Sequence, residues 1–111
     1  MATIFEKIIN KEIPSEILYE DDLVIAIKDK FPKAPIHLLI ISKKVIPSFQ
    51  KIEKEDLPII GRMIEIAQKL AKDFKIEKGY RLLTNVGAPS GQTIFHLHFH
   101  LLGGRDLLEM G

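Results

Sequence analysis

The sequence predicts a single α+β domain, residues 1–111, in which one long helix covers an antiparallel sheet of about five strands. Short apolar or alternating runs separated by turn-forming residues are typical of strands, and they occur at 16–20, 23–28, 36–42, 80–86 and 95–101. Between the third and fourth of these runs, residues 53–74 repeat their apolar side chains at helical spacing. A chain of 111 residues can bury about two thirds of its unfolded surface, so it needs no disulfide or structural metal to fold.

Composition excludes several classes of partner. Sixteen Lys and Arg against fifteen Asp and Glu give a formal charge of +1. This small net charge does not indicate a broad basic surface for nucleic acid or for an anionic membrane. The chain contains no Cys, has no apolar run of 18 residues, and does not begin with a basic segment followed by an apolar one. We therefore expect a soluble, cytoplasmic protein without a nucleic-acid or membrane partner.

The chain opens with a short amphipathic helix followed by a hairpin. Ile4, Phe5, Ile8 and Ile9 lie at helical spacing within residues 4–12, and Ile13-Pro14 ends the pattern, which favours a flap packed on the core. The strand-like runs 16–20 and 23–28 are separated by Asp21-Asp22, which predicts a tight turn between two adjacent strands.

Two residues near the third strand have both a structural and a functional interpretation. Asp29 follows the hairpin, where its two carboxylate oxygens could accept from the hydroxyls of a ribose, although a lone Asp at a strand end is more often a solvated turn residue. Residues 31–35 form a Pro-containing connector that is not helical. The run 36–42 is apolar on both sides and predicts a central strand, so His37 enters a mostly apolar environment and could be a core histidine.

The long helix of residues 53–74 is predicted to begin near Glu55 or Asp56, because Pro58 is tolerated only in the first turn. We assign it to the core and give it no chemistry. Its apolar face is predicted to consist of Ile60, Met63, Ile64, Ala67, Leu70, Ala71 and Phe74.

The next strand, 80–86, ends at Asn85 and leads into a loop of small residues at 87–91. Such a loop lets backbone N–H groups approach an anion, and its short length predicts antiparallel pairing with the strand that follows.

That last strand carries three histidines in alternation with apolar residues. Strict alternation places His96, His98 and His100 on one side, with neighbouring imidazoles about 6.6 Å apart along the strand. Two or three of them could surround one small anionic group.

Three interpretations of this stretch compete. The histidines could be incidental polar residues on a solvated face. They could supply two zinc ligands, but the further ligands would then have to be His37 or a carboxylate. They could also act on a phosphate, because a neutral imidazole is a nucleophile and its neighbours can donate hydrogen bonds to phosphoryl oxygens.

The stretch His-Leu-His-Phe-His-Leu-Leu-Gly-Gly at 96–104 resembles the histidine triad (HIT) motif. The preceding Gly91-Gln92-Thr93 and the following Gly-Gly-Arg resemble the Hint branch of that superfamily, the purine nucleoside phosphoramidases. The resemblance extends from Ile4-Phe5 to Arg105 and covers nearly the whole chain. It implies a HIT-like fold that forms homodimers, a purine nucleotide substrate of the AMP or GMP type, and hydrolysis of a P–N bond without a metal or other cofactor.

The resemblance also implies roles for individual residues. His98 would attack the α-phosphate and form a nucleotidyl-histidine, and His96 and His37 would orient the site. If His98 attacks as the free base, kcat/KM falls below roughly pH 6 to 6.5. Phosphate and ribose contacts would come from His100, Thr93, Gln92 (through its backbone or side chain), Asn85 and Asp29, and the apolar wall around the base from Phe5, Ile8, Ile27 and Leu39.

Two departures from the resembling family bear on specificity. Lys30 stands beside the expected base pocket, where an apolar residue is usual, and residues 106–111 lack the Trp-Pro-Pro ending of eukaryotic members. Gly103-Gly104 argues against the dinucleoside polyphosphate hydrolase branch, and His100 argues for hydrolysis over nucleotidyl transfer. Besides polyphosphate hydrolysis, the remaining alternative is a nucleotide-binding regulatory protein whose hydrolysis is incidental.

Overall fold

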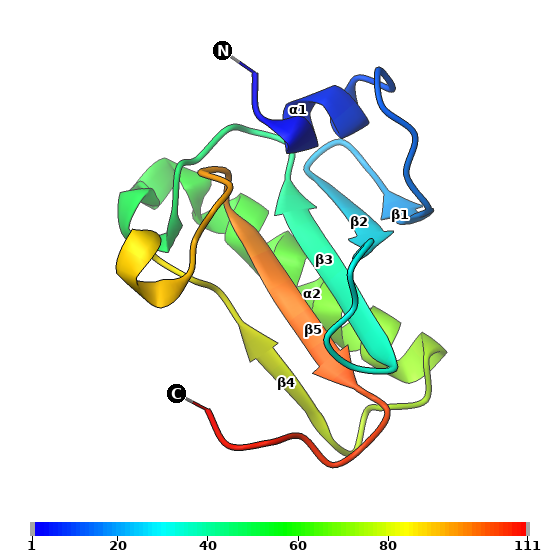
Figure 1. Cartoon of the computed structure of the whole chain (residues 1–111). Helices are drawn as coiled ribbons and strands as arrows, with labels where there is room; N and C mark the ends of the chain where they lie inside the picture. The colour runs from blue at the N-terminus through cyan, green and yellow to red at the C-terminus, as the bar shows by residue number, and fades with distance from the viewer. Residues whose placement is uncertain (1, 111) are drawn as a thin grey trace.

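A computed structural model describes residues 2–110 and contains a five-stranded antiparallel sheet with two α-helices (Figure 1). The strand order across the sheet is β1-β2-β3-β5-β4. The predicted α+β architecture is confirmed. In chain order the elements are α1 (Ile4–Ile9), β1 (Ile17–Glu20), β2 (Val24–Lys28), β3 (Ile36–Ser42), α2 (Leu57–Asp73), β4 (Tyr80–Leu83) and β5 (His98–Gly103), with short 3-10 turns at Phe49–Lys51, Lys54–Asp56 and Ala88–Ser90. No helix within residues 2–110 combines the length and the apolar character needed to cross a membrane.

The hairpin turn between β1 and β2 is built by Asp21, as the Asp-Asp pair predicts. Its Oδ1 accepts from the backbone N–H of Leu23 at 2.7 Å and from that of Val24 at 2.9 Å, while its own N–H donates to the Val24 carbonyl at 2.9 Å. The turn therefore satisfies its own backbone groups and passes the chain directly into β2.

The two faces of the sheet pack against different helices. On one face α2 covers a core that includes Val24, Ala26, Leu38 and Ile40, and Figure 1 shows this helix running behind the strands. On the other face a smaller apolar cluster joins Phe5 and Ile8 of α1 to Ile25, Ile27, Leu39 and Ile41. Register places His100 opposite Leu39 and His98 opposite Ile41, so these two histidines belong to the α1 face.

Helix α2 begins at Leu57 with Pro58 in its first turn, which confirms the predicted start. The predicted apolar face is wrong at one position, because Ile64 is 46% exposed whereas Ile66 is only 5% exposed. Positions 63, 66, 67, 70 and 71 form the buried stripe. Ile64 lies outside the centre of this stripe, and counting apolar residues alone does not distinguish its centre from its edge.

The last two strands are shorter than predicted. Strand β4 ends at Leu83 rather than at Val86, and β5 begins at His98 rather than before His96. The segment between them leaves the ladder at Thr84, whose hydroxyl donates to the His98 carbonyl at 2.9 Å. The predicted antiparallel pairing of β4 with β5 is confirmed, but the connection is longer than a tight hairpin.

Candidate active site

A cavity of about 610 Å³ lies between α1, the end of β2 and the two histidines of β5. Its apolar part is formed by α1 and the sheet, and its polar part by the ends of the strands and the segment before β5. Of the residues that the sequence singles out, those that line it are His98, His100, Asp29, Asn85, Gln92, Thr93, Phe5, Ile8, Ile27 and Leu39. His96 and His37 do not line the cavity and are buried behind it, 0% and 6% exposed.

His98 presents one free ring nitrogen to this cavity. Its Nδ1 lies 2.6 Å from the backbone carbonyl of His96, and a carbonyl only accepts, so the ring proton of the neutral imidazole is on Nδ1. The lone pair is therefore on Nε2. Phe5 packs against the ring edge-on, with 4.8 Å between ring centroids. Burial lowers the pKa of His98 below its ordinary value, which keeps the imidazole neutral and nucleophilic near neutral pH.

His96 is placed differently from the sequence-based expectation. It precedes β5 and is fully buried, with Nε2 at 2.6 Å from the Ser42 carbonyl and Nδ1 at 2.9 Å from the Thr3 hydroxyl. Both ring nitrogens are thus occupied by protein groups. Among the four imidazoles within residues 2–110, His98 and His100 line the cavity. The prediction that strand alternation places His96 on the same side as these two is therefore wrong, because β5 begins only at His98, whereas two imidazoles at one anion remain within the predicted two or three.

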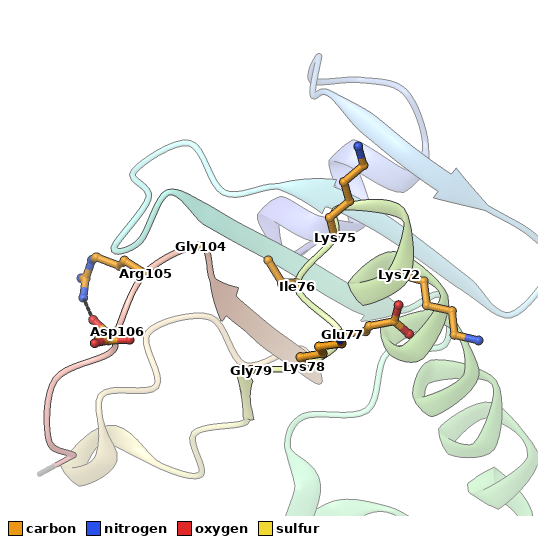
Figure 2. A pocket seen from close by; sticks show the side chains of 9 residues that line it. All are labelled: Lys72, Lys75, Ile76, Glu77, Lys78, Gly79, Gly104, Arg105 and Asp106. Carbon is orange, nitrogen blue, oxygen red and sulfur yellow. Dashed lines mark hydrogen bonds between the residues drawn. The ribbon is translucent and has the colours of Figure 1, made fainter.

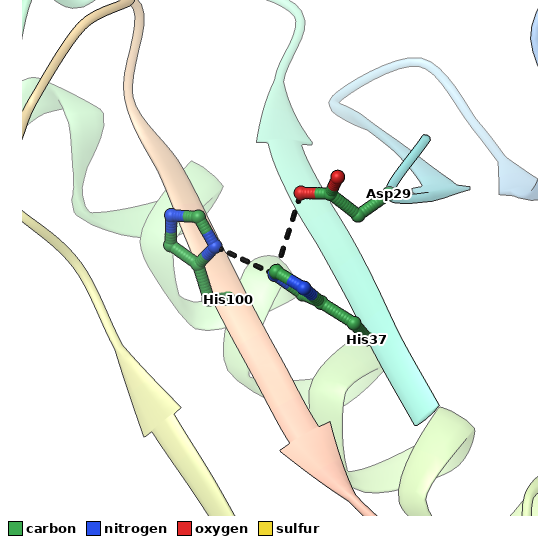
Figure 3. A group of neighbouring side chains, drawn as sticks. All are labelled: Asp29, His37 and His100. Carbon is green, nitrogen blue, oxygen red and sulfur yellow. Dashed lines mark hydrogen bonds and ion pairs between the residues drawn. The ribbon is translucent and has the colours of Figure 1, made fainter. Parts of the chain in front are cut away.

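The His37 ring lies between His100 and Asp29 and contacts both through its Nε2 (Figure 3). The Lys33 backbone N–H donates to His37 Nδ1 at 3.0 Å, which leaves the proton of neutral His37 on Nε2. That N–H faces His100 Nδ1 at 2.9 Å and Asp29 Oδ2 at 3.4 Å. His100 then accepts at Nδ1 and carries its own proton on Nε2, where it can donate.

The pKa of His100 is lowered to about 4, mainly by burial and further by the neighbouring His98 and His37. The imidazole of His100 is therefore neutral at physiological pH. It can donate a hydrogen bond to an oxyanion without itself being a cation.

The same three side chains satisfy the spacing of a metal site, since ligand atoms of Asp29, His37 and His100 lie within 4.8 Å of one another. The hydrogen-bond directions do not fit a metal. A metal-bound imidazole directs its second N–H to an acceptor, whereas the second nitrogen of His37 faces the N–H donor of Lys33. We therefore interpret the cluster as a hydrogen-bond chain.

Gln92 has no hydrogen-bond donor to spare for a ligand. Its side-chain amide donates to the carbonyls of Pro47 at 2.9 Å and Ile94 at 3.1 Å, its Oε1 accepts from the Gly87 N–H at 2.8 Å, and its own N–H donates to Gly87 O at 3.1 Å. These bonds hold the segment that carries Thr93. The Thr93 hydroxyl, by contrast, has no partner within residues 2–110 and lines the cavity.

Sequence reasoning missed three groups that fix the histidines: the Thr3 hydroxyl, the Ser42 carbonyl and the Lys33 N–H. Thr3 and Glu6 carry the spacing of a helix capping box, so the sequence contains a signal for the cap, although not for its contact with His96. The two backbone groups have no signal of their own in the sequence.

A second hollow of about 500 Å³ lies between the end of α2 and the segment after β5 (Figure 2). It is more open than the cavity at the histidines, and its lining contains no histidine. Lys72, Lys75 and Glu77 are among the charged side chains around it. The chemistry of the molecule is concentrated at the first cavity.

Comparison with known proteins agrees with this geometry. The family model of the HIT domain matches residues 10–107, which is most of the chain. The chain belongs to the HIT family. In this HIT domain, His98 and His100 of the motif line the cavity, and the first motif histidine, His96, is buried behind it.

Three relatives of this HIT protein match over more than nine tenths of their own length. The purine nucleoside phosphoramidase of Escherichia coli K12 is 50% identical over 109 residues, covering 97% of this chain and 92% of that protein. A HIT-like protein of Chlamydia pneumoniae is 50% identical over 105 residues, covering 95% and 96%. Among solved structures, a HIT family hydrolase from Clostridium thermocellum has a TM-score of 0.93 at 50% identity, covering 97% of this chain and 95% of that chain.

Proposed function

We propose that this HIT protein hydrolyses the P–N bond of purine nucleoside 5'-phosphoramidates through a nucleotidyl-His98 intermediate. The observation that carries the proposal is the 2.6 Å hydrogen bond from His98 Nδ1 to the His96 carbonyl, because it leaves Nε2 as a neutral nucleophile at the cavity. The 50% identity to a protein named purine nucleoside phosphoramidase supports this choice of substrate class.

In the first step His98 Nε2 forms a bond to the α-phosphorus while the P–N bond breaks. The amine leaves with the bonding electron pair and takes up a proton from water. The phosphorylated imidazole is a cation, and the His96 carbonyl on its Nδ1–H stabilises that charge. In the second step water attacks phosphorus and gives up a proton, which neutralises the hydroxide left when the amine was protonated. The bond to Nε2 breaks with its electron pair returning to the imidazole, and the nucleoside monophosphate leaves with His98 restored.

Charge on the phosphoryl oxygens requires donors from the cavity wall. His100 supplies its Nε2–H, which is fixed by the bond between its Nδ1 and His37. Thr93 supplies a hydroxyl that has no hydrogen-bond partner within residues 2–110, and Asn85, which lines the same cavity, carries an amide that can donate. Gln92 supports this group by holding the loop.

The rest of the cavity suits a nucleoside. Phe5, Ile8, Ile27 and Leu39 form an apolar wall for the base, and Asp29 lies beside them with carboxylate oxygens that can accept from ribose hydroxyls. One Asp29 oxygen already accepts from the Phe31 N–H at 2.8 Å, which fixes the orientation of the carboxylate. Lys30 also lines the cavity, so the base meets a cation there as well as an apolar wall.

We also propose a homodimer formed along the edge strand β4. This strand is paired only with β5 among the described strands, and its Tyr80 and Leu82 side chains are 38% and 41% exposed. An open strand edge with exposed apolar side chains is a surface that a second copy can cover.

The deciding experiment is hydrolysis of adenosine 5'-phosphoramidate in the presence of EDTA by the native chain and by His98→Ala. We expect metal-independent release of AMP that falls by at least about 10³-fold in the variant, because the nucleophile itself is removed. Native protein that binds AMP but does not turn over would contradict hydrolysis and favour a nucleotide-binding regulator. Activity lost in EDTA and restored by zinc would contradict the histidine mechanism, and faster cleavage of a dinucleoside polyphosphate would contradict the substrate class.

A further inference from the structure

The Thr3 side chain joins the N-terminal helix to the histidines. As the residue preceding α1, Thr3 accepts the Glu6 N–H at its hydroxyl oxygen at 3.1 Å, and its own N–H donates to the Glu6 carboxylate at 2.9 Å. This reciprocal pair caps a helix of only six residues. The Thr3 hydroxyl also lies 2.9 Å from Nδ1 of His96, ninety-three residues further along the chain.

The direction of this long-range hydrogen bond follows from its neighbours. His96 Nε2 lies 2.6 Å from the Ser42 carbonyl, which can only accept, so the proton of neutral His96 is on Nε2 and its Nδ1 carries a lone pair. The Thr3 hydroxyl therefore donates a hydrogen bond to His96 Nδ1 and accepts one from the Glu6 N–H. These two bonds use the single O–H donor of Thr3 and one lone pair of its oxygen.

His96 transmits this contact to the nucleophile. Its ring is held between Thr3 and Ser42, and its backbone carbonyl holds Nδ1 of His98 at 2.6 Å. Phe5, two residues after Thr3, packs edge-on against both rings, at 5.8 Å from His96 and 4.8 Å from His98. Helix α1 lines the cavity, and the His96 carbonyl sets the tautomer of His98. The Thr3 hydroxyl therefore connects α1 to the residue that carries this carbonyl.

We infer that Thr3 is a positioning residue that couples the seating of α1 over the cavity to the alignment of His98 for attack. The inference rests on the proposed phosphoramidase function and adds a residue that touches neither phosphate nor base. If the inference is right, loss of the Thr3 hydroxyl slows the chemical step and lowers kcat. Loss of the helix cap alone weakens substrate binding and raises KM.

Three variants separate these effects. Thr3→Val keeps the shape of the side chain and removes the hydroxyl. Thr3→Ser keeps the hydroxyl, and Glu6→Ala weakens the cap while leaving the hydroxyl that bonds His96. With adenosine 5'-phosphoramidate we expect Thr3→Val, which loses both the cap and the bond to His96, to raise KM and to lower kcat roughly tenfold. We expect Thr3→Ser to recover kcat to within about twofold, and Glu6→Ala to raise KM with kcat unchanged within about twofold.

A second readout does not depend on turnover. The nitrogen chemical shift of His96 Nδ1 should move toward that of an unbonded lone pair in Thr3→Val and stay in place in Glu6→Ala. Equal effects of Thr3→Val and Glu6→Ala on kcat and KM, or an unmoved Nδ1 resonance in Thr3→Val, would overturn the inference. An inactive native protein would instead overturn the proposed function and with it the catalytic role of Thr3, while the resonance would still decide whether the hydroxyl holds His96.

Discussion

At the scale of single residues, the chemistry depends on which nitrogen of each imidazole carries its proton. Backbone groups decide this in three cases: the His96 carbonyl for His98, the Ser42 carbonyl for His96 and the Lys33 N–H for His37. His100 takes its tautomer from His37. Backbone groups are held by the sheet and its connections, so the four rings are oriented before a substrate enters the cavity.

The pH dependence of the reaction is a prediction at this scale. Attack needs neutral His98, and burial lowers its pKa below the ordinary value of 6.5. We expect kcat/KM to be level above that value and to fall only at lower pH, as the pH passes through the depressed pKa. The acid limb therefore lies below the range of roughly pH 6 to 6.5 expected from an unperturbed histidine.

A matched variant tests the cause of that shift. Phe5 packs on the His98 ring at 4.8 Å between centroids, so Phe5→Ala should admit water and move the acid limb back toward pH 6.5, while KM rises because the cavity wall is lost. The measurement is kcat/KM from pH 4.5 to 8 for both proteins. Identical limbs in the two proteins would show that burial by Phe5 does not set the pKa of His98.

At the scale of elements, each face of the sheet has its own helix and its own task. The long helix α2 buries one face and fixes the shape of the sheet, whereas the short helix α1 covers part of the other face and leaves the cavity beside it. A six-residue helix has little stability of its own, so α1 depends on its cap at Thr3 and on the burial of Phe5 and Ile8. Helix α1 can therefore line the site with little stability of its own, because the core between α2 and the sheet does not depend on it.

The neighbouring isoleucines of α2 give a matched stability prediction. Ile66→Ala should lower the free energy of unfolding by about 2–4 kcal/mol, because Ile66 is 5% exposed within the core, whereas Ile64→Ala should cost less than about 1 kcal/mol at 46% exposure. Urea titration followed by circular dichroism measures both. Equal losses would show that Ile64 is covered in solution.

At the scale of the whole molecule, the five-stranded sheet ends in two open strands, β1 and β4. Strand β1 carries charged pairs at its end, where Glu20 contacts Lys11 at 2.6 Å and Lys43 at 2.8 Å, and such charges discourage pairing with another strand. Strand β4 exposes Tyr80 and Leu82. The asymmetry favours association of two copies through β4.

The dimer is tested by sedimentation. We expect native protein to sediment at twice its chain mass of 12.6 kDa, and Leu82→Asp to shift it toward the monomer by placing a charge on the β4 edge. Ile17→Asp, at a residue 39% exposed on β1, is the matched control and should leave the dimer intact. A monomeric native protein, or dissociation only by the control, would refute the β4 interface.

The sequence by itself determined the architecture and most of the cavity. Period-two and period-3.6 patterns depend on which side chains face a core, and that local rule predicted the five strands, apart from the ends of β4 and β5, and a start of α2 close to Pro58. The residues expected to line the cavity came from the resemblance to the HIT motif, and those named for phosphate, ribose and base contacts do line it. The resemblance of the histidine stretch to the HIT motif predicted the family.

Only the tertiary structure decided the hydrogen-bond partners of each histidine. It withdrew His96 from the cavity, occupied the donors of Gln92 and brought the Thr3 hydroxyl to His96. These outcomes depend on hydrogen bonds between groups far apart in the chain, several of them backbone groups that every residue carries. Sheet register and the packing of α1 determine which of these groups form hydrogen bonds with one another. A pattern of side chains along the sequence does not specify those pairs.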